Sequence, residues 1–205
     1  ETIDYVLEPQ ASFVLMDPHS GEVLALTGGR GEKKQSKTLN RASNVLRQPG
    51  STFKVISSFA PAIDLYGATL ASTYYDSEYT VGKKTFKNWY SGGYLGFQSI
   101  RDGIVYSLNI VAVRCLMETV KPERGYQYAE SLGITSLVKD DENAALALGG
   151  LTRGVSNLEL TQAYGVIANG GKLQKAKFFS KIIDQNGKVL IDTTEDEATQ
   201  VMKES

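Results

Sequence analysis

The chain has 205 residues, with 22 Lys and Arg against 23 Asp and Glu, a formal net charge of -1 and 41% hydrophobic residues. These values fit one large globular domain, exclude a disordered or fibrous chain, and give no electrostatic reason to expect nucleic acid or an anionic membrane as a partner. A single Cys and a single His exclude an internal disulfide and a metal site built on either residue, so we expect no metal and no cofactor.

Neither a membrane span nor a signal peptide is visible, because no run approaches 18 apolar residues and the start lacks a basic and then apolar segment. The chain opens at Glu1 without an initiator Met and closes at Ser205. We therefore expect it to be a piece of a longer polypeptide.

Two β-hairpins are predicted, one near each end of the chain. In the first, Pro18 and Gly21 favour a reversal between two β-rich runs. In the second, Asn186 and Gly187 supply residues that tolerate the positive φ of a tight turn. The four predicted strands cover residues 12–17, 22–27, 180–184 and 188–192.

Helical patterns fill the middle of the chain. The first predicted helix begins near Ser51, carries apolar residues at helical spacing and ends at Gly67. A later helix opens with a capping box from Ser156 to Glu159 and stops at Gly170. Three further helices are predicted over residues 100–107, 110–120 and 122–133.

The segment 69–98 separates the first two predicted helices and is rich in Tyr and Gly. A loop of this length is usually functional or a small insertion, and we predict one of these two. Helices clustered between two hairpins, without repeated strand–helix–strand units, predict an α+β fold in which helices pack against an antiparallel sheet. The glycine pairs at 28–29 and 170–171 match no phosphate-binding pattern, which argues against a nucleotide site.

Ser51 and Lys54 place a hydroxyl and an amine three residues apart at a predicted helix start, on one face with Cβ atoms about 5–6 Å apart. A serine becomes a useful nucleophile when a base takes its proton, and lysine is such a base only with a pKa well below about 10.4. The helix dipole and burial both lower that pKa. On spacing alone, a Ser cap followed by a surface Lys is the commoner reading.

Ser107-Leu108-Asn109 stands at the predicted junction of two helices. The Ser107 hydroxyl can relay a proton, and the Asn109 carboxamide offers a donor and an acceptor to a substrate amide. In isolation, a simple helix cap is again the commoner reading of this tripeptide.

The segment from Leu46 to Lys54 closely resembles the active-site segment of penicillin-binding proteins. The similarity spans nearly the whole chain in the right order, and the Arg-Gln-Pro-Gly-Ser form looks more like the bifunctional class A type than class B. The resemblance implies the fold of penicillin-binding transpeptidases and serine β-lactamases. The other matching stretches are residues 16–29, 39–42, 107–114, 148–150 and 155–171.

A function follows from the resemblance, namely a D,D-transpeptidase that cross-links peptidoglycan stem peptides. By residue-for-residue similarity, Ser51 would attack the penultimate D-alanine and Lys54 would be the acylation base. Ser107 would relay a proton to the leaving amine, and Asn109 would bind the substrate amide. β-Lactam antibiotics would acylate Ser51. The family also implies the extracytoplasmic face of the bacterial cell membrane, an anchor outside this chain and a glycosyltransferase domain upstream.

One part of the family pattern is absent, because no Lys-Thr-Gly follows Asn109. The partial matches at 37–39 and 84–86 both precede Ser107. In the family that motif lies on a strand that lines the site and donates a backbone N–H to the oxyanion hole. We therefore expect residues 1–205 to be the N-terminal larger part of a transpeptidase domain. Its final strands would lie on the C-terminal remainder of the same domain, a separate or unresolved segment.

Other chemically notable residues have ordinary explanations. Cys115 is expected to be a small buried apolar side chain, and His19 to be solvated in a turn. The position of Glu159 in a capping box explains it without a catalytic role. Trp89 has two readings, because it either lines the rim of a peptide cleft or pins down its own loop.

Two alternatives to a transpeptidase stay open. A serine β-lactamase shares the serine and the lysine but requires a further base that activates water for deacylation. A non-enzymatic penicillin-sensing domain would be acylated without forming a cross-link.

Overall fold

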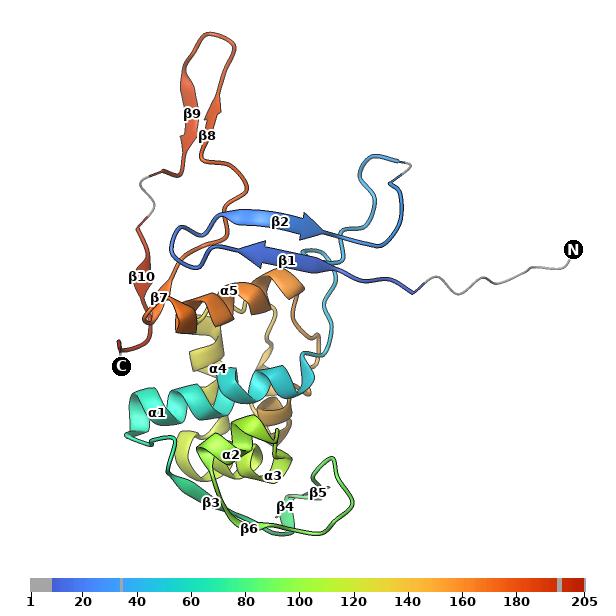
Figure 1. The fold of residues 1–205 in the computed structure, drawn as a ribbon, viewed down its shortest axis with the longest axis vertical. Coiled ribbons are helices and arrows are strands. Elements are labelled where there is room, and N and C mark those ends of the chain that lie inside the picture. The colour runs from blue at the N-terminus through green and yellow to red at the C-terminus, as the bar shows by residue number, and fades with distance from the viewer. Residues whose placement is uncertain (1–8, 34, 195–196, 205) are drawn as a thin grey trace, which may run out of the picture.

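The computed structural model describes residues 9–33, 35–194 and 197–204. Helices occupy the middle of the molecule, one β-hairpin lies beside them, a second hairpin projects at one end and short strands lie at the other (Figure 1). The predicted α+β class is confirmed. In place of one sheet, however, the described strands form five separate antiparallel pairs.

The first predicted hairpin consists of β1 (Phe13–Met16) and β2 (Val23–Thr27). A bulge between Leu15 and Met16 shifts its register. One face of the hairpin packs against α5 (Asn157–Ala168), as Figure 1 shows. Side chains on the other face, such as Phe13, are exposed.

Helical backbone begins near Ser51, as predicted. It opens as a 3-10 turn (Gly50–Thr52), continues through a π-helical segment (Val55–Phe59) and ends as α1 (Ala60–Tyr66). Pro61 has no N–H for the carbonyl four residues earlier, which accounts for the wider π turn at this point.

The segment 69–98, predicted as a loop or small insertion, contains four strands and lies against the following helices. The partners in one pair are about twenty residues apart, so no local turn signal marks that pair in the sequence. The pairs are β3 (Thr73–Asp76) with β6 (Gly96–Ser99), and β4 (Tyr79–Val81) with β5 (Lys84–Phe86).

Three helices follow close to their predicted positions. They are α2 (Ile100–Val105), α3 (Asn109–Arg114), which continues as a π-helical segment (Cys115–Val120), and α4 (Pro122–Ser131). Short 3-10 helices then cover Lys139–Asp141 and Ala144–Leu148.

α5 begins at the predicted capping box, where Ser156 Oγ accepts a hydrogen bond from Glu159 N and Glu159 Oε2 accepts one from Ser156 N. The second predicted hairpin projects from the molecule (Figure 1). It is formed by β8 (Lys181–Ile183) and β9 (Val189–Asp192), beside the pair of β7 (Lys172–Leu173) and β10 (Thr199–Gln200).

The main hydrophobic core lies between the helices and fixes the backbone on either side of Lys54. No helix within the described residues is long and apolar enough to cross a bilayer. The largest fully buried side chains of the core include Phe53, Ile56, Phe59, Ile100, Leu108, Ile110 and Leu116.

Candidate active site

Lys54 stands at the centre of the candidate site. Its side chain is 2% exposed, and its ammonium Nζ donates to Ser107 O at 2.6 Å, to Ser107 Oγ at 2.9 Å and to Asn109 Oδ1 at 2.7 Å. All three N–H donors of an ammonium are thereby used. The fold therefore brings together two sequence motifs that lie more than fifty residues apart. The first motif is Ser51 to Lys54, and the second motif is Ser107 to Asn109.

Burial lowers the pKa of Lys54 to about 8. At that pKa about one amine in ten is neutral at pH 7, against about four in ten thousand for a lysine with the reference pKa of about 10.4. The site thus supplies a lysine that can accept a proton near neutral pH.

Ser107 lies in the short connection between α2 and α3, as predicted, and adopts a φ of +52°. This left-handed conformation costs a non-glycine residue about 1–2 kcal/mol. Because of it, the carbonyl and the hydroxyl of Ser107 both reach Lys54 Nζ. Backbone strain of this kind gathers where a site requires a particular geometry.

Asn109 opens α3 and is held from two sides. Its Oδ1 accepts from Lys54, and its Nδ2 donates to Lys87 O at 2.9 Å. Since an ammonium only donates and a carbonyl only accepts, the carboxamide has one orientation. Within the described chain, the second N–H of Nδ2 has no acceptor, so it is available to a ligand.

Ser51 lies three residues before Lys54, in the 3-10 turn, and its side chain is exposed. Among the described residues, no hydrogen bond joins its hydroxyl to Lys54, whose donors all point to the second motif. A ligand can therefore approach Ser51 from solvent, next to a buried amine.

The chain on either side of Ser51 is held by distant segments. Before it, Gln48 Oε1 accepts from Leu151 N at 2.7 Å, and Gln48 Nε2 donates to Leu151 O. After it, Tyr164 OH in α5 donates to Thr52 O at 2.6 Å. These contacts fix the backbone on both sides of Ser51 against segments about a hundred residues later in the chain.

Trp89 is 70% exposed, yet its Nε1 donates to Tyr106 O at 3.0 Å, and its ring stands edge-on to Tyr90 with centroids 5.6 Å apart. Tyr106 immediately precedes Ser107. Trp89 thus attaches its loop to the residue before Ser107, as one of the two readings made from the sequence expects, while most of the indole stays exposed.

The sequence analysis did not identify Asn88 as a site residue, although Asn88 contacts the second motif directly. Its Oδ1 accepts from the backbone N–H of Asn109 and of Ile110. One feature of the sequence could have indicated such a residue. Leu108, at the cap position of α3, has no side-chain oxygen, so the free N–H groups of the first turn require an acceptor from another segment.

Cys115 and Glu159, for which the sequence predicts structural roles, have surroundings that fit those roles. Cys115 is fully buried, and burial raises the pKa of its thiol to about 12. Burial alone would raise the pKa of Glu159, but hydrogen bonds from Thr135 and Ser156 outweigh burial and leave that pKa lowered. A carboxylate engaged in this way is a poor candidate for a water-activating base.

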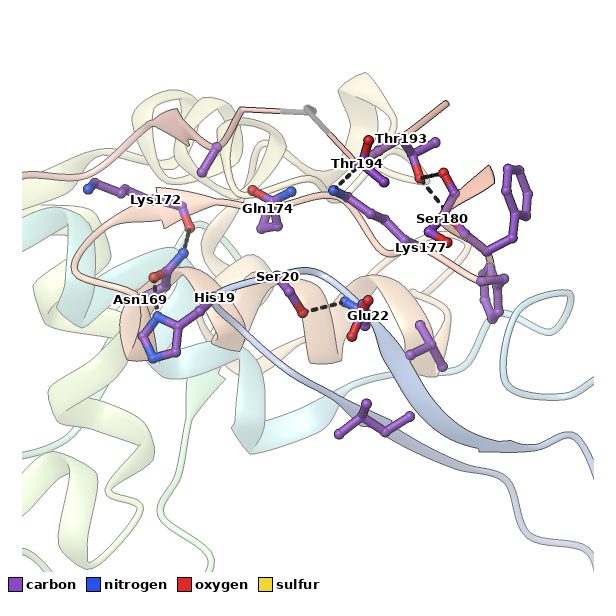
Figure 2. Close-up of a pocket in the computed structure, with 15 residues that line it drawn as sticks. His19, Ser20, Glu22, Asn169, Lys172, Gln174, Lys177, Ser180, Thr193 and Thr194 are labelled. Atoms are coloured by element: carbon purple, nitrogen blue, oxygen red, sulfur yellow. Dashed lines mark hydrogen bonds between the residues drawn. The ribbon is translucent and has the colours of Figure 1, made fainter. Parts of the chain in front are cut away.

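A separate cavity of about 670 Å³ lies beside the turn between β1 and β2 (Figure 2). His19, which is exposed as predicted, approaches Asn169 Oδ1 to 2.7 Å there, and Lys177 Nζ donates to Thr193 O at 2.8 Å. None of the residues around Lys54 lines this cavity. No group of three or more His, Cys, Asp and Glu side chains in the described residues could hold a metal ion.

Comparison with known sequences identifies the family to which the chain is similar. The model of the penicillin binding protein transpeptidase domain matches residues 11–205. Penicillin-binding protein 1A of Clostridium botulinum (strain Langeland) is 37% identical over 203 residues, which cover 91% of this chain and 24% of the relative. Penicillin-binding protein 1F of Bacillus subtilis is 38% identical over 187 residues, covering 91% and 25%. The chain thus spans about a quarter of the length of these relatives.

Solved structures show the same similarity. PonA1 of Mycobacterium tuberculosis in complex with penicillin V has a TM-score of 0.79 and 25% identity, with 95% of this chain and 54% of that chain covered. Penicillin-binding protein 1A of Haemophilus influenzae has a TM-score of 0.75 and 29% identity, covering 90% and 27%.

Proposed function

The chain belongs to the penicillin-binding protein transpeptidase family, and on that premise we propose that it is a serine-type D,D-transpeptidase. It cross-links peptidoglycan stem peptides through an acyl-enzyme on Ser51 and is acylated at the same hydroxyl by β-lactam antibiotics. The observation that carries the proposal is the buried amine of Lys54, three residues from an exposed serine and bonded to both polar residues of the second motif.

Proton transfer is assigned to Lys54 and Ser107. The neutral form of Lys54 takes the proton of Ser51 Oγ as the hydroxyl attacks the carbonyl of the penultimate D-alanine. The Lys54 ammonium passes a proton to Ser107 Oγ, 2.9 Å away, and Ser107 delivers one to the leaving amine of the terminal D-alanine. An amine on a second stem peptide then resolves the ester, and the cross-link forms.

Substrate binding is assigned to Asn109 and, at the rim, to Trp89. The second N–H of Asn109 Nδ2 donates to a carbonyl of the stem peptide, because the rest of the carboxamide is already engaged. The exposed indole of Trp89 offers an apolar surface beside the same turn. We place this reaction on the extracytoplasmic face of the cell membrane, with an anchor and a glycosyltransferase domain on other parts of the polypeptide.

Labelling by a fluorescent penicillin, followed by peptide mapping, tests the proposal. When a segment with Lys-Thr-Gly is supplied, in the same polypeptide or as a second one, wild-type protein should carry one label, on Ser51. Ser51→Ala should then carry none while keeping its melting temperature. Ser43→Ala is the matched control, because among the described residues that hydroxyl donates only to the neighbouring Asn44. This substitution should leave labelling unchanged. Labelling of Ser51→Ala at the wild-type rate would remove Ser51 from the role of nucleophile.

Two further assays separate the proposal from its alternatives. Sustained hydrolysis of penicillin over many equivalents would indicate a β-lactamase and contradict a transpeptidase. Acylation without any cross-linking of a lipid-linked peptidoglycan precursor would indicate a penicillin sensor.

A further inference from the structure

The first turn of α3 receives its cap from a distant residue. Leu108, at the cap position, has no side-chain acceptor for the free N–H groups of this turn. Asn88 supplies one, since its Oδ1 accepts from Asn109 N at 2.9 Å and from Ile110 N at 3.2 Å. The position of the second motif therefore depends on a side chain more than twenty residues earlier.

Asn88 is itself fixed by a partly buried network centred on Asp76. Its Nδ2 donates to Asp76 Oδ1 at 2.8 Å and to Tyr90 OH at 2.9 Å, so the amide uses both donors and both acceptor positions. Asp76 is 1% exposed and accepts further hydrogen bonds from Tyr90 OH and from Leu95 N, both at 2.9 Å. A network with every member satisfied holds its side chains in one arrangement.

The backbone carbonyl of Lys87, next to Asn88, also holds Asn109. Lys87 O accepts from Asn109 Nδ2, so the dipeptide Lys87-Asn88 holds both the side chain and the backbone of Asn109. Asn109 Oδ1 is left facing Lys54 Nζ at 2.7 Å. A shift of this dipeptide would therefore move an acceptor of the proposed base and the amide that would bind substrate.

We propose that Asn88 is a positioning residue for the reaction at Ser51. Asn88 connects the Asp76 network to the first turn of α3 and so fixes the position of that turn. Its effect on the reaction is indirect, because it positions Asn109, which contacts Lys54. This role rests on the proposed function, because it is a role in that reaction. A plain structural cap would stabilise the fold without any specific dependence on Asn109, and that difference is measurable.

A double-mutant cycle makes the measurement, on the full chain supplied with a segment that carries Lys-Thr-Gly. The acylation rate constant and the dissociation constant for a fluorescent penicillin are compared in wild type, Asn88→Ala, Asn109→Ala and the double variant. Asn88→Ala should lower the acylation efficiency by up to about 10²-fold, the loss that a misplaced reacting group can cause. In the Asn109→Ala background the same change should add little, because the residue through which it acts is already gone.

Asp184→Ala is the matched control. Asp184 Oδ1, like Asn88 Oδ1, accepts from two backbone N–H groups, those of Asn186 at 2.8 Å and Lys188 at 2.9 Å, in the turn between β8 and β9. Its loss should loosen that turn and leave acylation near the wild-type rate in both backgrounds. If Asn88→Ala does not fold, Tyr90→Phe removes one partner of Asn88 and should give a smaller fall with the same dependence on Asn109.

The outcomes separate the two proposals. Wild-type labelling at Ser51 with an undiminished rate in Asn88→Ala would overturn the positioning role alone. So would equal losses in the presence and absence of Asn109, which would identify a structural cap. A wild-type protein that is not labelled at Ser51 even with the Lys-Thr-Gly segment supplied would overturn the proposed function, and this role with it.

Discussion

Gly149 lies directly against Gly50, the residue before Ser51. A Cβ on Gly149 would stand 2.6 Å from Gly50 N, and the φ of Gly149 is +67°, a conformation that side-chain-bearing residues rarely adopt. The family-like segment 148–150 thus has a physical role here. It lets a second stretch of backbone support the turn that presents the nucleophile.

Gly149→Ala is expected to impair acylation beyond its effect on stability. The left-handed φ alone costs about 1–2 kcal/mol, and the clash should also displace the Ser51 turn, with a loss of about tenfold or more in acylation rate. Gly67→Ala is the control, because Gly67 has a φ of +68° with no atom near its Cβ position. Thermal melts and penicillin labelling of both variants make the comparison. Equal labelling rates would show that the contact with Gly50 does not position Ser51.

Acylation should depend on pH through Lys54. Because burial lowers its pKa to about 8, the neutral base should be lost as pH falls through about 8, and the rate should drop about tenfold per unit below it. Stopped-flow acylation between pH 6 and 10 tests this expectation. A rate that continues to rise to pH 10 would indicate an ordinary lysine, and a flat profile would exclude Lys54 as the base.

Titration of Lys54 should also make the free energy of unfolding depend on pH. The folded state binds fewer protons at Lys54 than the unfolded state between about pH 8 and the reference pKa of about 10.4. The contribution of Lys54 to the free energy of unfolding should therefore rise with pH across that window. Denaturant titrations of wild type and Lys54→Met at pH 7 and pH 10 isolate it. An unchanged difference between the two proteins would contradict the lowered pKa.

Cys115 should be inert in the native state. It is fully buried, its Sγ lies 3.4 Å from Ser58 O, and burial raises the pKa of the thiol to about 12. A thiol reagent should react only after unfolding. Cys115→Ala should cost about 1 kcal/mol of stability, similar to one buried methyl group, and leave acylation unchanged. A variant that folds but cannot be acylated would show that the site has been wrongly assigned.

Elements set by local chemistry were predictable from sequence. The Asn186-Gly187 turn and the Ser156 capping box each depend on residues within a few positions, and both form as predicted. The strand pair of Thr73–Asp76 with Gly96–Ser99 was not predictable, because it joins segments separated by about twenty residues. The π-helical segment after Lys54 was missed for a related reason, since helical periodicity does not distinguish it.

The candidate site likewise has parts that the sequence predicts and parts that only the fold shows. The spacing of Ser51 and Lys54 places two side chains together but favours an ordinary cap, and only the long family-like pattern raised it to a catalytic hypothesis. The contacts of Lys54 with Ser107 and Asn109 are properties of the fold. Asn88 was not predicted because its partners in the second motif are backbone N–H groups, which carry no sequence signature.

The last prediction concerns the Lys-Thr-Gly motif, for which no match follows Asn109. We expect that motif to donate to the oxyanion hole and to bind the substrate carboxylate. Among the described strands, β1 and β2 pair only with each other, and a single bridge to Lys177 covers the start of β2. Phe13, Leu15 and Leu24 are about half exposed or more on this hairpin. Unpaired edges and exposed apolar side chains favour association, so residues 1–205 alone should be poorly soluble or slow to react.

Supplying a segment with Lys-Thr-Gly, in the same polypeptide or as a second one, should raise penicillin labelling by at least the 10²- to 10³-fold that one oxyanion-hole donor typically provides. The control is the same segment with the motif replaced by Ala-Ala-Ala, which should restore solubility without restoring the rate. If residues 1–205 alone fold to a monomer and label as fast as the supplemented protein, the third motif is dispensable. The oxyanion would then have to be held by donors within this chain, beginning with the backbone N–H of Ser51.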